Sequence, residues 1–377
     1  MIPPINSNPR CPPITPGQNN PPAGISNGQV ITQFEARQLA QPKPILHNPH
    51  CLPFLNADTF SHSFSLLGYG GIFLCARVCK LWNEHSEKLP WQQFSENEGL
   101  LLIEEGKETN RKEEFRVLYP MTINLRMIEE VFGRVAGKIP CMRRDIFNKC
   151  YEQDPFEPST DPLKPLLMMH TFKVVVIPAF IERTSGPDFS FALDEKGDLQ
   201  PVEPGKVIGE KLQIPLGIYN LKILCENPLA GKENGPVFSY FRLEILDQCN
   251  TLPVKMRVCF MRKCIAPGSR NQSYSAQKAL VKSHGFGVTS LIERVFFNAV
   301  GILKFGTCQD GQNPLTYART SDSITILSAF PIAIAGSKHE LVVGGFALRK
   351  GADVSNSGYV HDSIGVAPGV SAEGSAT

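Results

Sequence analysis

Apolar and polar residues alternate over much of the chain after residue 166. A period of two places every second side chain on one face of a strand, and aromatic and β-branched residues are frequent in these runs. Ser290 precedes apolar residues at helical spacing and predicts a helix, and a weaker helical pattern covers residues 276–282. The alternation predicts strands at residues 172–177, 219–225, 237–246, 254–260, 324–327 and 341–346.

Strands outnumber helices in this part of the chain, and their connections are of hairpin length or irregular. That arrangement is typical of an α+β fold with a mainly antiparallel sheet. We therefore expect a β-rich α+β domain over residues 166–350.

Between residues 55 and 94 the apolar residues recur at helical spacing instead. Asp58 can cap a first helix, and the glycines of residues 68–71 break the chain after it. Further apolar positions at helical spacing follow, and Pro90 places the end of a third helix near Trp91. The apolar stripe of the first helix consists of Phe60, Phe64 and Leu67.

The remaining segments differ in composition. A charged helical pattern predicts a helical extension at residues 96–153, and four prolines within residues 154–165 predict a linker. Residues 1–50 are rich in Pro and Asn and are expected to be disordered. The Gly-, Ser- and Ala-rich residues 351–377 are expected to form a flexible tail. Between the N-terminal tail and the helical extension, the helices predicted around residues 55–94 form a three-helix module, to which we assign residues 51–95.

Charge and composition narrow the function classes. The 38 basic and 36 acidic residues give a formal charge of +2, which argues against a nucleic-acid or membrane-surface partner. The start of the chain lacks the pattern of a secretory signal, and no window approaches the ~18 consecutive apolar residues of a membrane span. We expect a soluble, cytoplasmic protein.

Candidate chemistry is sparse. The 11 cysteines include no CxxC pair, so we expect reduced structural thiols and neither a metal nor a cofactor. Glu182-Arg183 and Asp194-Glu195 are expected to be solvated charges. No catalytic motif is present, and we predict no enzyme. The alternative is a cysteine-dependent hydrolase or transferase, with Cys308 as the most exposed thiol. Its candidate residues are Cys225, Cys259 and Cys308, paired with His284, His339 or His361.

The spacing between residues 55 and 94 resembles an F-box. The matching residues are Leu55-x-x-Asp58, the Phe-Ser-Leu-Leu of residues 64–67, the Val-Cys-Lys-Leu-Trp of residues 78–82, and Trp91. The chain departs from the family pattern at Asn56, Ser63 and Gly71. The chain as a whole is similar to the F-box proteins of amoeba-associated chlamydiae, through residues 317–322 and 343–347.

This resemblance implies a function. An F-box binds the Skp-type adaptor of a cullin-RING ubiquitin ligase, and the C-terminal domain would hold the protein to be ubiquitinated. The similarity to chlamydial proteins implies a bacterial effector delivered into the host-cell cytosol. The alternative is an interaction or structural protein whose module packs only against its own chain. The residues expected at the adaptor interface are Leu55, Phe60, Phe64, Leu67, Ile72, Phe73, Val78, Cys79, Trp82 and Trp91.

Overall fold

A computed structural model describes the part of the chain discussed from here on, all of it within the compact unit Tyr69–Thr377. The predicted tail of residues 1–50 and the module up to residue 90 lie outside the described residues, as does most of the predicted linker. The described residues are 91–97, 111–137, 156, 171–203, 206, 208–242, 245–246, 248, 255–309, 316–325, 338–347, 351–357 and 360–373.

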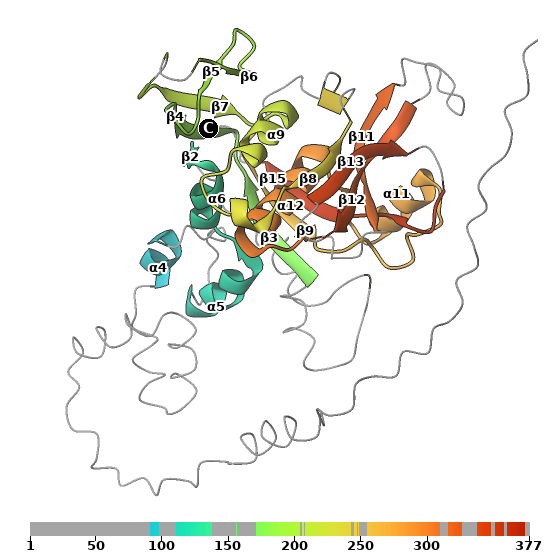
Figure 1. The fold of residues 1–377 in the computed structure, drawn as a ribbon. Helices are drawn as coiled ribbons and strands as arrows, with labels where there is room; N and C mark the ends of the chain where they lie inside the picture. The colour runs from blue at the N-terminus through green and yellow to red at the C-terminus, as the bar shows by residue number, and fades with distance from the viewer. Residues whose placement is uncertain are drawn as a thin grey trace, which may run out of the picture. The chain divides into compact units, whose positions relative to one another are not determined.

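The described residues form a mixed α+β structure with several sheets, as expected (Figure 1). The larger sheets each contain five strands. The helices are α4 (Trp91–Asn97), α5 (Arg111–Met121), α6 (Leu125–Phe132), α9 (Ile218–Glu226), the 3₁₀ helix η1 (Lys232–Asn234), α11 (Tyr274–Ser283) and α12 (Leu291–Phe305).

The first five-stranded sheet has the order β1-β3-β9-β15-β10. Its strands pair antiparallel except for β1 and β3, which are parallel. The two edge strands, β1 and β10, are two residues long. The strands are β1 (Thr122–Ile123), β3 (Phe172–Ile177), β9 (Arg257–Arg262), β15 (Pro368–Glu373) and β10 (Gly287–Val288).

The second five-stranded sheet has the order β14-β11-β12-β13-β8. Its edge strands β14 and β8 run parallel to their neighbours, and the inner pairs are antiparallel. The register of β11 against β12 shifts between Arg319 and Ser323. The strands are β14 (Ile364–Val366), β11 (Tyr317–Thr325), β12 (Lys338–Ala347), β13 (Gly351–Ser357) and β8 (Phe238–Phe241).

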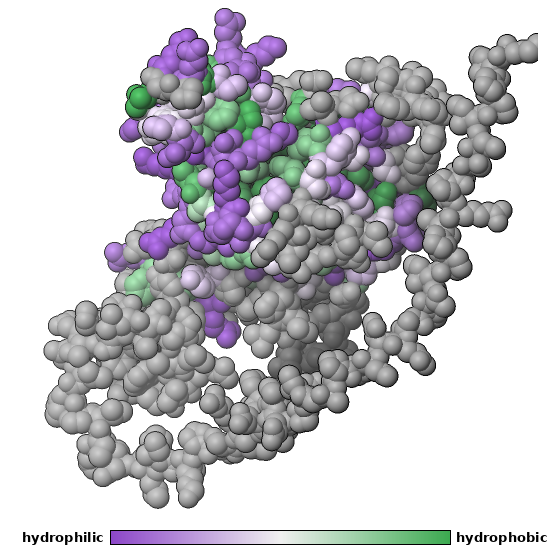
Figure 2. Space-filling model, viewed as in Figure 1, coloured by the Kyte–Doolittle hydropathy of each residue, from purple (hydrophilic) through white to green (hydrophobic). Residues whose placement is uncertain are grey.

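The described residues also form two small sheets. The three-stranded sheet joins β2 (Arg134–Ala136), β4 (Phe180–Thr184) and β7 (Lys211–Pro215), and β5 (Phe191–Leu193) pairs with β6 (Leu199–Pro201). In the edge strand β7 exposed and buried positions alternate. Its exposed Lys211 discourages pairing of this edge with another chain. Figure 2 shows hydrophilic residues over much of the region around β5, β6 and β7.

Helix α12 is the central element. It contacts β3 of the first sheet, β11 and β12 of the second, and helices α6 and α9. Its sequence, LIERVFFNAVGILKF, is apolar on almost every side, which is typical of a helix with no solvent face. Ser290 caps the helix as predicted, and Gly306 ends it in the left-handed conformation (φ 65°) that suits glycine.

Several predicted elements are confirmed. The strand at residues 172–177 is β3, and the weaker helix at 276–282 is α11. Residues 257–260 and 341–346 fall within β9 and β12. The strand at 237–246 is shorter than expected: β8 covers residues 238–241, and residues 245–246 are helical.

The strand predicted at residues 219–225 is wrong, because this segment is helix α9. The apolar residues of IYNLKILCE also recur at helical spacing: Ile218, Leu221, Leu224 and Cys225 are all buried. The polar residue Asn220 also lies among these buried positions, whereas the strand pattern would have placed it on the solvent face. Its buried side chain donates to the Gly197 and Pro215 carbonyl oxygens, both at 2.9 Å, and accepts from the Leu199 amide at 2.7 Å.

The flexible tail predicted from residue 351 is also wrong as far as Glu373. These residues supply β13, β14 and β15, and β15 lies between β9 and β10 inside the first sheet. The small residues are needed for close packing rather than for flexibility. A Cβ atom at Gly365 would lie 2.6 Å from the Ile265 side chain, and one at Gly369 would lie 2.5 Å from Thr289 Cγ2.

The segment predicted as a separate helical extension shares the core of the domain. Besides α5 and α6, it contains β1, which pairs with β3, and β2, which pairs with β4. The rings of Phe132 on α6 and Phe296 on α12 are 5.5 Å apart. The hydrophobic core therefore extends to both sides of the predicted linker.

The position of β15 yields a prediction. A chain ending at residue 363 lacks β14 and β15 and leaves β9 without one of its two neighbours, so we expect it to lose cooperative unfolding. A chain ending at Glu373 keeps every described strand and should melt within a few degrees of the full chain. Circular dichroism during heating distinguishes the two. Equal melting of both truncated chains would contradict the central place of β15.

Candidate functional site

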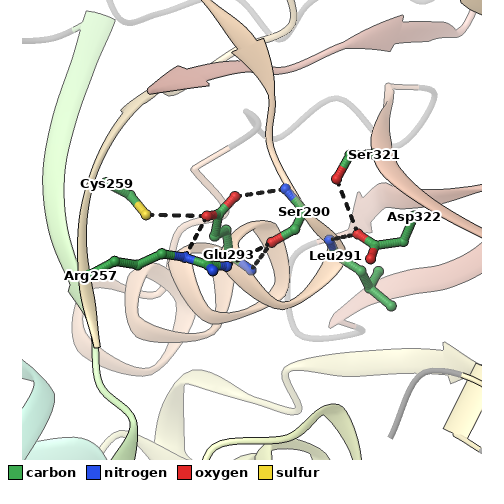
Figure 3. Close-up of polar contacts among 7 residues, drawn as sticks. All are labelled: Arg257, Cys259, Ser290, Leu291, Glu293, Ser321 and Asp322. Atoms are coloured by element: carbon green, nitrogen blue, oxygen red, sulfur yellow. Dashed lines mark hydrogen bonds and ion pairs between the residues drawn. The ribbon is translucent and has the colours of Figure 1, made fainter. Parts of the chain in front are cut away.

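A cluster of polar side chains surrounds the first turn of α12 (Figure 3). It draws residues from three elements that are distant in sequence. The members are Arg257 and Cys259 on β9, Ser290, Leu291 and Glu293 at the start of α12, and Ser321 and Asp322 on β11.

Glu293 is the centre of this cluster. One carboxylate oxygen, Oε2, accepts from the Ser290 amide at 2.7 Å, and the Ser290 hydroxyl accepts from the Glu293 amide at 3.4 Å, which completes a capping box. The other oxygen, Oε1, lies 2.8 Å from Arg257 Nε and accepts from Cys259 Sγ at 3.4 Å. Because Glu293 is only 7% exposed, the arginine compensates a charge that would be costly alone.

Asp322 is the second carboxylate at this helix end. Its Oδ2 accepts from the Leu291 amide at 2.5 Å and from the Ser321 hydroxyl at 3.4 Å. The Ser321 amide in turn donates to the Thr289 carbonyl oxygen at 2.9 Å. The residues lie where the register of β11 shifts, a common means of redirecting a side chain. Negative charge at a helix N-terminus is also favoured by the helix dipole.

The predicted candidate thiols are all buried. Burial, and then the Glu293 carboxylate, raises the pKa of the Cys259 thiol well above its ordinary value. Burial likewise raises the pKa of Cys225. The expectation that Cys308 is exposed is wrong: it is 5% exposed, its Sγ donates to Asn298 Oδ1 at 3.2 Å, and burial raises its pKa to about 12. Thiols of this kind are poor nucleophiles near neutral pH.

The predicted candidate histidines contact other groups. His284 ends α11, and its ring lies 4.7 Å from that of Phe156. His339 Nδ1 is 3.3 Å from Asn356 Nδ2. His361 Nδ1 is 2.6 Å from Ser363 Oγ and 2.9 Å from Asp362 Oδ1, within one exposed turn. The structure therefore pairs the thiols of Cys259 and Cys308 with a carboxylate and an amide rather than with an imidazole.

Arg183, which we expected to be solvated, is buried in β4. Its guanidinium donates to the Asn227 carbonyl oxygen at 2.5 Å and lies 3.8 Å from the centre of the Phe189 ring. Burial lowers its pKa to about 10. Asp194, which we also expected to be solvated, is half-buried, and its carboxylate accepts from the Lys196 and Asp198 amides at 2.8 and 2.9 Å.

Trp91 is the one predicted adaptor-binding residue among the described residues; the other nine lie outside them. We placed it at the end of the third helix, but it begins α4. The side chain is 3% exposed, and its ring lies 5.6 Å from that of Phe94 and 5.3 Å from that of Phe115. In this structure Trp91 holds α4 against α5 and offers little surface to a partner.

A cavity of about 260 Å³ adjoins the polar cluster. It lies between the first turn of α12 and the strands β9, β15 and β10. Its residues are Cys259, Met261, Gly285, Gly287, Val288, Thr289, Glu293, Gly369 and Val370. Among the described residues no group of three or more His, Cys, Asp or Glu side chains could hold a metal.

Sequence reasoning missed Arg257, Glu293 and Asp322. One signal was present, because Ser290-x-x-Glu293 has the spacing of a capping box before an apolar run. Arg257 and Asp322 come from strands, and only the tertiary structure brings them to the helix.

No helix in the described part of the chain is long and apolar enough to cross a membrane. Comparisons with family models, curated proteins and solved structures find no match.

The ion pair between Arg257 and Glu293 gives a second prediction. Arg257→Met leaves the carboxylate buried without its cation and should lower the free energy of unfolding by about 3–5 kcal/mol. Adding Glu293→Gln removes the charge but keeps the capping acceptor, so the double variant should recover most of that loss. Urea unfolding gives the free energy of unfolding of the wild type, of Arg257→Met and of the double variant.

A matched control is Lys304→Met, which breaks the exposed pair between Lys304 and Glu130. Exposed pairs contribute about 0–1 kcal/mol, so this variant should change little. If the double variant were no more stable than Arg257→Met alone, the electrostatic account of the cluster would be wrong.

Thiol accessibility gives a third prediction. Cys264 is exposed, whereas Cys225, Cys259 and Cys308 are buried. Iodoacetamide at pH 7.5 should therefore modify Cys264 on the order of 10-fold faster than the other three, or more. Peptide mass spectrometry at timed intervals measures the rates. Rapid modification of Cys308 in the folded protein would restore the cysteine-enzyme alternative.

Proposed function

We propose that this protein is a substrate-recruiting adaptor of a cullin-RING ubiquitin ligase. Residues 55–94 dock onto a Skp-type subunit, and the α+β domain holds the protein to be ubiquitinated. The observation that carries this proposal is the spacing of Leu55, the 64–67 and 78–82 segments, and Trp91. A module of about 40 residues cannot bury all of its apolar side chains internally, so the remaining ones favour a partner surface.

The structure of the neighbouring residues supports a docking role. An adaptor must hold its two partners at a fixed separation, which requires firm connections between its parts. Trp91 packs α4 against α5 through Phe115. Helix α5 ends at Met121 and continues directly into β1, whose residue Thr122 pairs with Val174 in the first sheet. The segment after the predicted module is therefore anchored in the core of the domain.

The chemistry of the described residues also favours binding over covalent catalysis. The carboxylates around α12 are held by helix amides and by Arg257, and burial raises the pKa of the candidate thiols. A protein that brings a target close to a ubiquitin-loaded enzyme needs neither a nucleophile nor a base of its own. In this scheme the chain contributes proximity.

A binding measurement tests the adaptor proposal. The full chain should retain a Skp-type protein at micromolar concentration, and Leu67→Asp or Trp82→Ala should weaken binding about 30-fold or more, as loss of a central interface residue does. Leu229→Asp is the matched control, since Leu229 lies outside the module and is 56% exposed. Isothermal titration calorimetry gives the affinities.

Circular dichroism must accompany this experiment, because truncating a buried tryptophan can itself unfold a small module. A folded wild-type chain that binds no Skp-type protein would exclude the adaptor function. Capture of a target protein without a Skp-type subunit would then favour the alternative of an interaction protein independent of the ligase.

A further inference from the structure

The cavity beside the start of α12 lies over a pair of glycines. Met261, Gly369 and Gly287 pair in one row across β9, β15 and β10. Paired residues in antiparallel strands project from the same face, so two side chains are missing beside Met261. The Thr289 methyl group fills the space over Gly369, but a Cβ atom on Gly287 would meet only the Gly369 carbonyl oxygen, at 3.6 Å. The open space therefore lies over Gly287.

The cavity is open at one end and polar at the other. Gly285 and Gly287 are exposed, and β10 is an edge strand of its sheet. At the inner end, Cys259 is 1%, Met261 0% and Glu293 7% exposed. A group entering beside β10 would therefore reach the polar cluster of Figure 3.

Glu293 is the one charged residue among those that line the cavity. Its charge is already compensated by Arg257 at 2.8 Å, so a cationic ligand would gain little from it. Arg257 and Cys259 both lie against Oε1, whereas Oε2 accepts one hydrogen bond, from the Ser290 amide. A carboxylate oxygen accepts two hydrogen bonds, which leaves Oε2 with room for one more donor. The inner end of the cavity therefore favours an uncharged N–H or O–H group.

The walls favour an aromatic ring. Cys259 and Met261 are two residues apart on β9, so both sulfur atoms lie on the face that borders the cavity. Sulfur makes favourable contacts with aromatic rings, and glycine backbone allows a flat ring to approach closely. The volume is about 260 Å³, whereas cavities of about 150 Å³ already hold benzene. One bicyclic ring therefore fits.

We propose that the cavity over Gly287 binds a planar, uncharged aromatic group that carries an N–H donor, of which indole is the simplest example. The ring lies against Gly287 and the two sulfur atoms, and the N–H donates to Glu293 Oε2. This assignment does not depend on the proposed function. In an adaptor, the same cavity would recognise a tryptophan side chain of the target.

Indole and benzofuran test the proposal, because the two molecules share a shape and benzofuran has no N–H. The full chain, with its methionine methyl groups labelled with ¹³C, is titrated with each compound and followed by NMR. Indole should shift the Met261 methyl signal in a saturable way, and benzofuran should bind about 10-fold more weakly or worse. Met261→Leu identifies the signal. Equal binding of the two compounds would overturn the proposed contact with Glu293.

Gly287→Leu should abolish indole binding, because the new side chain occupies the open space without strain. Gly186→Ala is the matched control, since nothing lies within 4 Å of the added Cβ and the residue is outside the cavity. Both variants should retain the wild-type melting temperature. If folded Gly287→Leu bound indole like wild type, or if wild type showed no saturable shift, the site would be disproved.

A capped Gly-Trp-Gly peptide distinguishes the two sources of the ligand. If the peptide shifts Met261 as strongly as indole, the cavity accepts a tryptophan side chain of a partner protein. If only indole does so, the ligand is a free small molecule. Both results support the assignment of the ring chemistry. Because these titrations need no Skp-type protein, their outcome is separate from that of the adaptor experiment.

Discussion

The structure depends on the burial of helix α12. The first-turn amides of a helix that packs against two sheets and other helices have little access to water, so side chains of the protein supply the acceptors. Ser290, Glu293 and Asp322 do so, and Arg257 compensates the charge that this brings inside. The polar cluster is thus a consequence of placing an apolar helix in the centre of the domain.

The packing at the start of α12 also accounts for the cavity. Thr289 directly precedes the Ser290 cap of α12, and its methyl group packs over Gly369, which pairs with Gly287 across β15 and β10. Thr289 fills one of the two glycine positions, and the other remains open beside Glu293. A site that can recognise a ligand has therefore formed next to a structural anchor, and the two functions share one carboxylate.

The sequence predicted the elements whose pattern is local. Residues 172–177 form a strand because most of them are apolar or β-branched. Ser290 caps a helix because its hydroxyl accepts from an amide only three residues further along the chain. The strand prediction for residues 219–225 was wrong because their apolar positions fit both the strand period of two and the helical period of about 3.6. The buried contacts of Asn220 favour the helix. The site could be predicted only as far as the spacing of Ser290 and Glu293, since Arg257 and Asp322 arrive from distant strands. The F-box resemblance remains a prediction from residues 55–94.

Strand β15 has a consequence for how the protein is made. The first sheet contains Thr122–Ile123 at one edge and needs Pro368–Glu373 in its interior, so its strands come from positions some 250 residues apart. During synthesis β9 emerges long before its partner β15, and the sheet cannot close until that segment has left the ribosome. Sheets with such distant pairings fold slowly. The nascent chain therefore carries an unpaired β9 edge while residues 263–367 are made, and an exposed strand edge of this kind is prone to aggregation and is a target for chaperones.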